Sequence, residues 1–159
     1  MKAYADTNFF TRFYVPNPDV PRLSRMIAAY LKREDEPLPF TPLHRLEFRN
    51  AIRLMVHRRQ QRGEVDLSPE QARRILRDHE NDLDERVFIT HRAIEWTEAI
   101  RLAERLSAAH TASEGFRSLD LLHVGAALAL RCGEFYSFDI AARRMASLAS
   151  LKVLPARIG

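Results

Sequence analysis

Short apolar stretches alternate along the chain with longer segments whose apolar residues recur every three or four positions. Short runs bounded by turn residues are typical of strands, and the longer spacing is typical of helices. The pattern predicts strands over residues 2–5, 38–40, 86–89, 135–138 and 152–154. It predicts helices over residues 8–14, 21–32, 42–62, 69–85, 92–109 and 119–131, and a last helix after Asp139. Strands that alternate with helices indicate an α/β fold with a mostly parallel sheet and helices on both faces.

Capping residues support several of the helix boundaries. Thr41, which precedes a proline, is expected to be the N-cap of the long third helix. Ser68 and Gln71 have the spacing of a capping box. Ser118 and Asp139 are expected to cap the two helices that follow them.

The length of 159 residues and the hydrophobic content of 46% fit one globular domain, covering residues 1–159. Cys132 is the single cysteine, which excludes an intramolecular disulfide and a multi-cysteine zinc site and indicates a reducing compartment. No apolar run approaches the ~18 residues of a membrane span. Asp6 interrupts the place where a signal peptide needs its apolar stretch, so we expect a cytoplasmic protein with no membrane contact.

Two acids directly follow predicted strands. Asp6 follows the first strand, and Asp139 follows the fourth. In open α/β sheets, ligands bind beyond the carboxyl ends of the strands. Each of these acids has a structural alternative, since an Asp after a strand is often the N-cap of the next helix.

Asp120 has no charged neighbour over residues 119–130, apart from any charge that His123 carries. A helix that is apolar on nearly all sides is buried, and an isolated carboxylate inside it is costly unless it is paired or holds a metal. The alternative is an acid in the first turn that is stabilised by the helix dipole.

Glu47 shares one row of the third helix with three apolar residues, Leu43, Ala51 and Leu54. The opposite side carries a row of arginines, Arg45, Arg49 and Arg53. Glu47 is therefore expected on the apolar face, where its alternative role is a salt bridge with an arginine such as Arg12.

Four carboxylates that converge in one cleft repel one another unless a divalent cation neutralises them. Oxygen ligands without cysteines or a clear histidine pair favour Mg²⁺ or Mn²⁺ over zinc. Such sites hydrolyse phosphodiester bonds. The net charge of +4 is compatible with a nucleic acid substrate but does not establish one.

The residues around these acids resemble the PIN domain, and more narrowly the toxins of VapBC-type toxin–antitoxin pairs. The matching segments are Ala5-Asp6-Thr7-Asn8, Glu47, Arg117-Ser118-Leu119-Asp120 with Ala126-Ala127, and Ser137-Phe138-Asp139. The resemblance implies a three-layer α/β/α sandwich, a Mg²⁺- or Mn²⁺-dependent endoribonuclease, a homodimer and a small VapB-like antitoxin as partner.

The resemblance also implies roles for individual residues. The principal metal ligands are Asp6 and Asp120, while Glu47 and Asp139 complete the site. Asn8 supports it, as do Thr7 and Ser137. Ser137 stands where many members of the family carry Thr, and its hydroxyl keeps the capacity for hydrogen bonding.

Two other functions are compatible with parts of this sequence. The Asp6-Thr7-Asn8 motif also resembles haloacid-dehalogenase phosphatases, but these need a second Asp where Asn8 stands. The same fold could also serve as a non-catalytic module that binds RNA or protein. The presence of all four acids argues against this second reading.

Other residues have both a functional and a structural interpretation. His123 lies three residues after Asp120, which allows a supporting hydrogen bond or proton transfer, although a lone histidine in an apolar helix is more often a packing residue. Arg49, Arg53 and Arg117 are candidates for binding RNA, with a solvated helix face as the alternative. The aromatic residues of the first helix are expected in the core or an interface. The acidic run over residues 78–85 is expected to be a solvated helix end.

Overall fold

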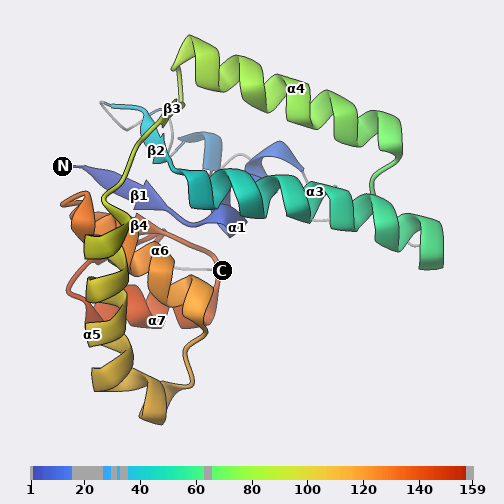
Figure 1. Cartoon of the computed structure of the whole chain (residues 1–159). Helices are drawn as coiled ribbons and strands as arrows, with labels where there is room; N and C mark the ends of the chain where they lie inside the picture. The colour runs from blue at the N-terminus through green and yellow to red at the C-terminus, as the bar shows by residue number, and fades with distance from the viewer. Residues whose placement is uncertain (1, 16–26, 30–31, 33–35, 63–65, 157–159) are drawn as a thin grey trace. The chain divides into compact units, whose positions relative to one another are not determined.

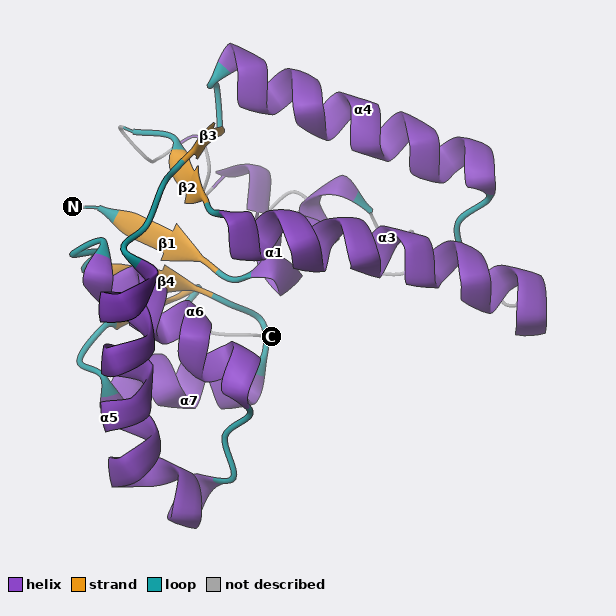
Figure 2. Cartoon of the chain, viewed as in Figure 1, coloured by secondary structure: helices purple, strands orange, loops and turns teal. Residues whose placement is uncertain are grey.

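The computed structural model describes residues 2–15, 27–29, 32, 36–62 and 66–156. Helices and strands alternate along the chain (Figure 2), which confirms the predicted α/β class. Most of the helix predicted over residues 21–32 lies outside the described residues. The chain forms two compact units, Met1–Asn8 with Ala93–Gly159, and Phe9–Arg92, and each is described by itself.

The first unit is built on a parallel sheet of three strands, β1 (Ala3–Ala5), β4 (Glu134–Tyr136) and β5 (Lys152–Leu154). The order is β1-β4-β5, and Tyr4 pairs with Phe135, which pairs with Val153. Three helices flank this sheet, α5 (Trp96–Glu114), α6 (Ser118–Ala129) and α7 (Ile140–Leu148) (Figure 1).

The core of the first unit lies between the sheet and these helices. Tyr4 and Phe135 are fully buried and stack with ring centroids 5.8 Å apart. Val124 of α6 and Met145 of α7 are also fully buried in this cluster. Gly125 lets α6 approach α5 closely, since a Cβ at this position would lie 2.3 Å from the Ala99 carbonyl oxygen.

The second unit contains most of α1 (Thr7–Tyr14) and a parallel pair of strands, β2 (Leu38–Phe40) and β3 (Ile89–His91). The helices α3 (Pro42–Arg62) and α4 (Pro69–Glu85) pack against each other (Figure 1). Phe9 and Phe10 are fully buried, which confirms the predicted core position for these aromatic residues of α1.

Several predicted helix ends are confirmed. The Ser68 hydroxyl accepts a hydrogen bond from the Gln71 backbone N–H at 3.1 Å, and the Gln71 side chain accepts one from the Ser68 N–H at 2.8 Å. Asp139 is the N-cap of α7, and α3 begins at Pro42, directly after Thr41.

Other boundaries differ from the prediction. The strand predicted over residues 86–89 is wrong, because Arg86 adopts a left-handed conformation (φ 55°) that ends α4, so that β3 begins only at Ile89. Ser118 is the first residue of α6 and not its N-cap, which is Arg117. α5 begins later than predicted, because the Glu95 side chain caps it through the Thr97 N–H.

The C-terminal ends of two helices also differ from the prediction. α5 continues past residue 109 until Gly115, which has a φ of 71°, and α6 ends at Ala129.

No helix within the described ranges is both long and apolar enough to pass through a membrane.

Candidate active site

Asp6 lies directly after β1, and its side chain is buried, with 6% of the residue exposed. Its backbone N–H donates to the Tyr136 carbonyl oxygen at 3.0 Å, which continues the pairing of β1 with β4. The Ser137 hydroxyl donates a hydrogen bond of 2.5 Å to Asp6 Oδ2. A buried carboxylate needs such a partner, so Ser137 stabilises Asp6 in place.

Asp139 is connected to Asp6 through the same serine. The Asp139 backbone N–H donates to Ser137 Oγ at 3.0 Å. Asp139 Oδ1 accepts a hydrogen bond of 2.8 Å from the Ala142 N–H at the start of α7. The structural alternative for Asp139, an N-cap, is therefore present, and the cap also fixes the direction of its carboxylate.

Asp120 lies in the first turn of α6 and is less buried than the uncharged sequence around it predicts. Its side chain is 18% exposed because the N-terminal end of the helix reaches the surface. The Arg117 Nε donates to Asp120 Oδ2 at 2.9 Å. This hydrogen bond, followed by the charge of Asp120 and a smaller contribution from Asp139, raises the pKa of Arg117 above its ordinary value.

Asp120 and Asp139 therefore both stabilise the charged form of the Arg117 guanidinium. Asp139 shares Ser137 with Asp6. Asp6 and Asp139 are thus joined through Ser137 where β1 and β4 end, while Asp120 pairs with Arg117 in the first turn of α6.

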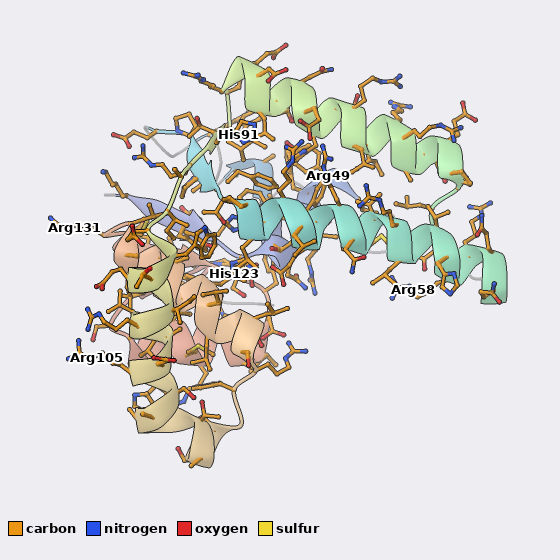
Figure 3. All side chains as sticks on the ribbon, in the orientation of Figure 1. Arg49, Arg58, His91, Arg105, His123 and Arg131 are labelled. Atoms are coloured by element: carbon orange, nitrogen blue, oxygen red, sulfur yellow. The ribbon has the colours of Figure 1, made fainter. Side chains whose placement is uncertain are left out.

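His123 is a buried residue of α6 that contacts Tyr4 of β1 (Figure 3 labels His123). Its Nδ1 is 2.9 Å from the Tyr4 hydroxyl, and its Nε2 is 3.2 Å from the Thr7 hydroxyl. Both ring nitrogens are used in these contacts, which favours the structural interpretation of His123. Thr7, predicted as a supporting residue, contacts His123, whereas Asn8 is exposed.

Arg143 is a residue of the site that the sequence pattern does not predict. One guanidinium nitrogen donates to the Ser137 carbonyl oxygen at 2.8 Å, and the other donates to the Pro155 carbonyl oxygen at 2.6 Å. Arg143 therefore ties the segment that carries Ser137 and Asp139 to the segment that follows β5. Its position four residues after the N-cap of α7 is the one signal in the sequence that could have suggested this role.

Glu47 belongs to the second unit and is partly buried on α3. The fully buried row of this helix is His44, Phe48 and Ile52, one step around the helix from the predicted row. Leu54, expected on the buried face, is 49% exposed.

The arginine row of α3 faces α4 in part. Arg45 Nη1 lies 3.2 Å from Glu80 Oε1, and Arg49 also forms an ion pair with Glu80. Arg53 is exposed. Farther along the helix, outside the row, Arg58 pairs with Asp66 at 3.1 Å (Figure 3 shows Arg49 and Arg58). Glu80 lies within the acidic run over residues 78–85, so the run is solvated at its end, where residues 84 and 85 are exposed, but also contributes an ion pair to α3.

The oxygen donors of Asp6, Asp120 and Asp139 have the chemistry that Mg²⁺ or Mn²⁺ prefers. Within the described ranges, however, no group of three or more His, Cys, Asp or Glu side chains is arranged to hold a metal ion. The hydrogen bond from Arg117 engages one oxygen of Asp120. The residue types therefore fit a divalent cation, while a positive side chain already pairs with one of the acids.

Comparison with known proteins supports the fold. No family model matches the sequence, and no curated protein matches it either. The chain is similar to the crystal structure of FitAcB from Neisseria gonorrhoeae, with a TM-score of 0.58 and 12% sequence identity over 95% of each chain. The likeness establishes the fold, a parallel sheet flanked by helices, and confirms the predicted fold class.

Proposed function

We propose that residues 1–159 form a single PIN domain that hydrolyses RNA phosphodiester bonds with a divalent metal ion. The observation that carries the proposal is the Ser137 hydroxyl, which contacts both the buried Asp6 carboxylate and the Asp139 backbone. Asp120 pairs with Arg117, whose pKa is raised by Asp120 and, to a smaller extent, by Asp139. A helix cap alone would account for Asp139, but it would not account for a buried Asp6 beside it.

Asp6, Asp120 and Asp139 would hold the metal ion, with Glu47 as a further ligand on the basis of the sequence resemblance. A bound Mg²⁺ or Mn²⁺ supplies Lewis-acid chemistry of the kind that hydrolyses phosphodiesters. No protein nucleophile is required, and the products would carry a 5′-phosphate and a 3′-hydroxyl.

The other residues of the site would orient the acids or attract the RNA. Ser137 holds Asp6, and Arg143 holds the Ser137 backbone. His123 joins Tyr4 to Thr7 and so fixes the end of β1 from which Asp6 projects. Arg49, Arg53 and Arg117 supply positive charge for the RNA backbone.

The proposal extends to partners. The sequence resemblance to the toxins of VapBC-type pairs supports a toxin role for this chain, and the fold shared with FitAcB is compatible with it. We expect that a small VapB-like antitoxin inhibits the enzyme. We also expect that the active form is a homodimer and that the protein is cytoplasmic.

A cleavage assay with labelled single-stranded and structured RNAs tests the proposed function. Cleavage is expected in Mn²⁺ or Mg²⁺, loss of cleavage with EDTA, and recovery when Mn²⁺ is returned. Asp120→Asn should lower the rate by about 100-fold, since even residues behind the ligands typically contribute 10–100-fold.

Glu98→Gln is the matched control, because Glu98 is a partly exposed acid of α5 that pairs with an arginine three residues away. Cleavage that persists in EDTA would overturn the metal mechanism. Binding of RNA without cleavage in Mn²⁺ would favour the non-catalytic RNA-binding module.

A further inference from the structure

Arg117 occupies an unusual place for a cation. It is the N-cap of α6, yet its side chain makes no capping hydrogen bond to the helix. Ser, Thr, Asp and Asn are the favoured N-caps, and the positive end of the helix dipole disfavours a cation there. The position therefore gives Arg117 no favourable role in the helix itself.

The contacts of Arg117 are instead with the acids of the candidate site. Its Nε donates to Asp120 Oδ2 at 2.9 Å, and Asp139 adds to the favourable electrostatics of its charged form. The guanidinium thus neutralises part of the negative charge that a divalent cation would otherwise neutralise.

The exposure of Arg117 allows another cation to replace its guanidinium at Asp120. The side chain of Arg117 is 74% exposed, whereas that of Asp120 is 18% exposed. Exposed ion pairs of this kind change an equilibrium by about fivefold or less, so water and ions can replace the guanidinium at little cost. A divalent ion carries twice the charge of the guanidinium and attracts the Asp120 carboxylate more strongly.

We propose that the Arg117 guanidinium and a divalent cation compete for the Asp120 carboxylate, so that Arg117 keeps the site charge-balanced until the metal binds. Arg117 is then a positioning residue that lowers the apparent metal affinity. The proposal rests on the proposed function, because it assumes that Asp120 is a metal ligand.

Calorimetric titration of the full chain with Mn²⁺ tests the competition without measuring catalysis. Arg117→Ala should bind Mn²⁺ about threefold to fivefold more tightly than the wild type, because one positive charge and one competing hydrogen bond are removed. Arg117→Lys should stay within about twofold of the wild type, since it keeps the charge. A merely structural role would not produce this rescue.

Arg101→Ala is the matched control. Arg101 pairs with Glu98 at the same spacing of three residues in α5, and its removal should leave the Mn²⁺ affinity unchanged. Thermal unfolding of each variant shows that it is folded.

Two different results would overturn the proposal. Equal or weaker Mn²⁺ binding by Arg117→Ala would overturn the competition and leave the proposed nuclease intact. No Mn²⁺ binding by either the wild type or Arg117→Ala would overturn the proposed function, and the competition with it.

Discussion

Ser137 donates a hydrogen bond of 2.5 Å to Asp6, although 131 residues separate the two in the sequence. The register of the sheet explains the contact. Ala5 pairs with Tyr136 at the ends of β1 and β4, so Asp6 and Ser137, which follow them, lie at the same edge of the sheet. Two residues with complementary chemistry are thereby held together by the backbone of two neighbouring parallel strands.

This contact predicts the effect of changing Ser137. Ser137→Ala removes the hydroxyl that holds the Asp6 carboxylate and should lower the RNA cleavage rate by about 10-fold to 100-fold. Ser137→Thr keeps the hydroxyl and should retain most of the activity. Equal rates for the alanine variant and the wild type would show that the hydrogen bond has no part in catalysis.

Arg143 predicts a structural effect near the same residues. Arg143→Met keeps much of the apolar stem but leaves the carbonyl groups of Ser137 and Pro155 without their charged donor. The free energy of unfolding in urea should fall by about 1.5–3 kcal/mol, the usual contribution of hydrogen bonds to charged groups. Arg105→Met, on the exposed side of α5, is the control and should change stability by less than about 0.5 kcal/mol.

Gly125 gives a prediction in which two effects have opposite signs. Helix propensity alone would make Gly125→Ala stabilising by about 1 kcal/mol. The new Cβ would meet the Ala99 carbonyl oxygen at 2.3 Å, so α5 and α6 would have to separate. Overpacking should win and lower the free energy of unfolding by about 1–3 kcal/mol. A more stable variant would contradict this close packing.

His79 makes the stability of the second unit depend on pH. It is fully buried, and neither ring nitrogen has a hydrogen-bond partner within the described ranges. Burial lowers its pKa from 6.5 to about 4; Arg49, Arg45 and His91 also lower it, while Glu80 opposes them. The imidazole is therefore neutral in the folded chain at neutral pH.

The sign of the effect follows from this lowered pKa. Between pH 6.5 and about 4, the unfolded chain binds a proton that the folded chain does not, so stability falls as the pH falls. The contribution is at most about 3 kcal/mol, from about 1.4 kcal/mol for each pKa unit. Urea unfolding of His79→Phe across this range should show a smaller loss than the wild type. An identical pH profile would show that His79 does not titrate in this way.

The parts of the site that the sequence predicts are those set by local pattern. Asp6 and Asp139 could be placed because each follows an apolar run that forms a strand. The capping box of Ser68 is equally local. The apolar residues after Arg86 predict a strand that includes it, but the left-handed conformation of Arg86 ends α4 instead.

The remaining contacts depend on tertiary structure. Arg143 reaches two carbonyl groups from different segments, and no pattern along one helix shows this. Glu80 pairs with arginines of another helix, so an acidic run that looks solvated becomes part of a helix interface. The partial exposure of Asp120 follows from where α6 begins on the surface, which its apolar sequence does not reveal.

The most direct test of the central claim is the initial rate of RNA cleavage in Mn²⁺ by the wild type and by Asp6→Asn. Asparagine keeps the size of the side chain but removes the charge that the metal needs. The proposed mechanism predicts a rate lower by at least about 100-fold for the variant, with unchanged thermal unfolding. Equal rates for the two proteins would contradict a metal-dependent nuclease built on Asp6.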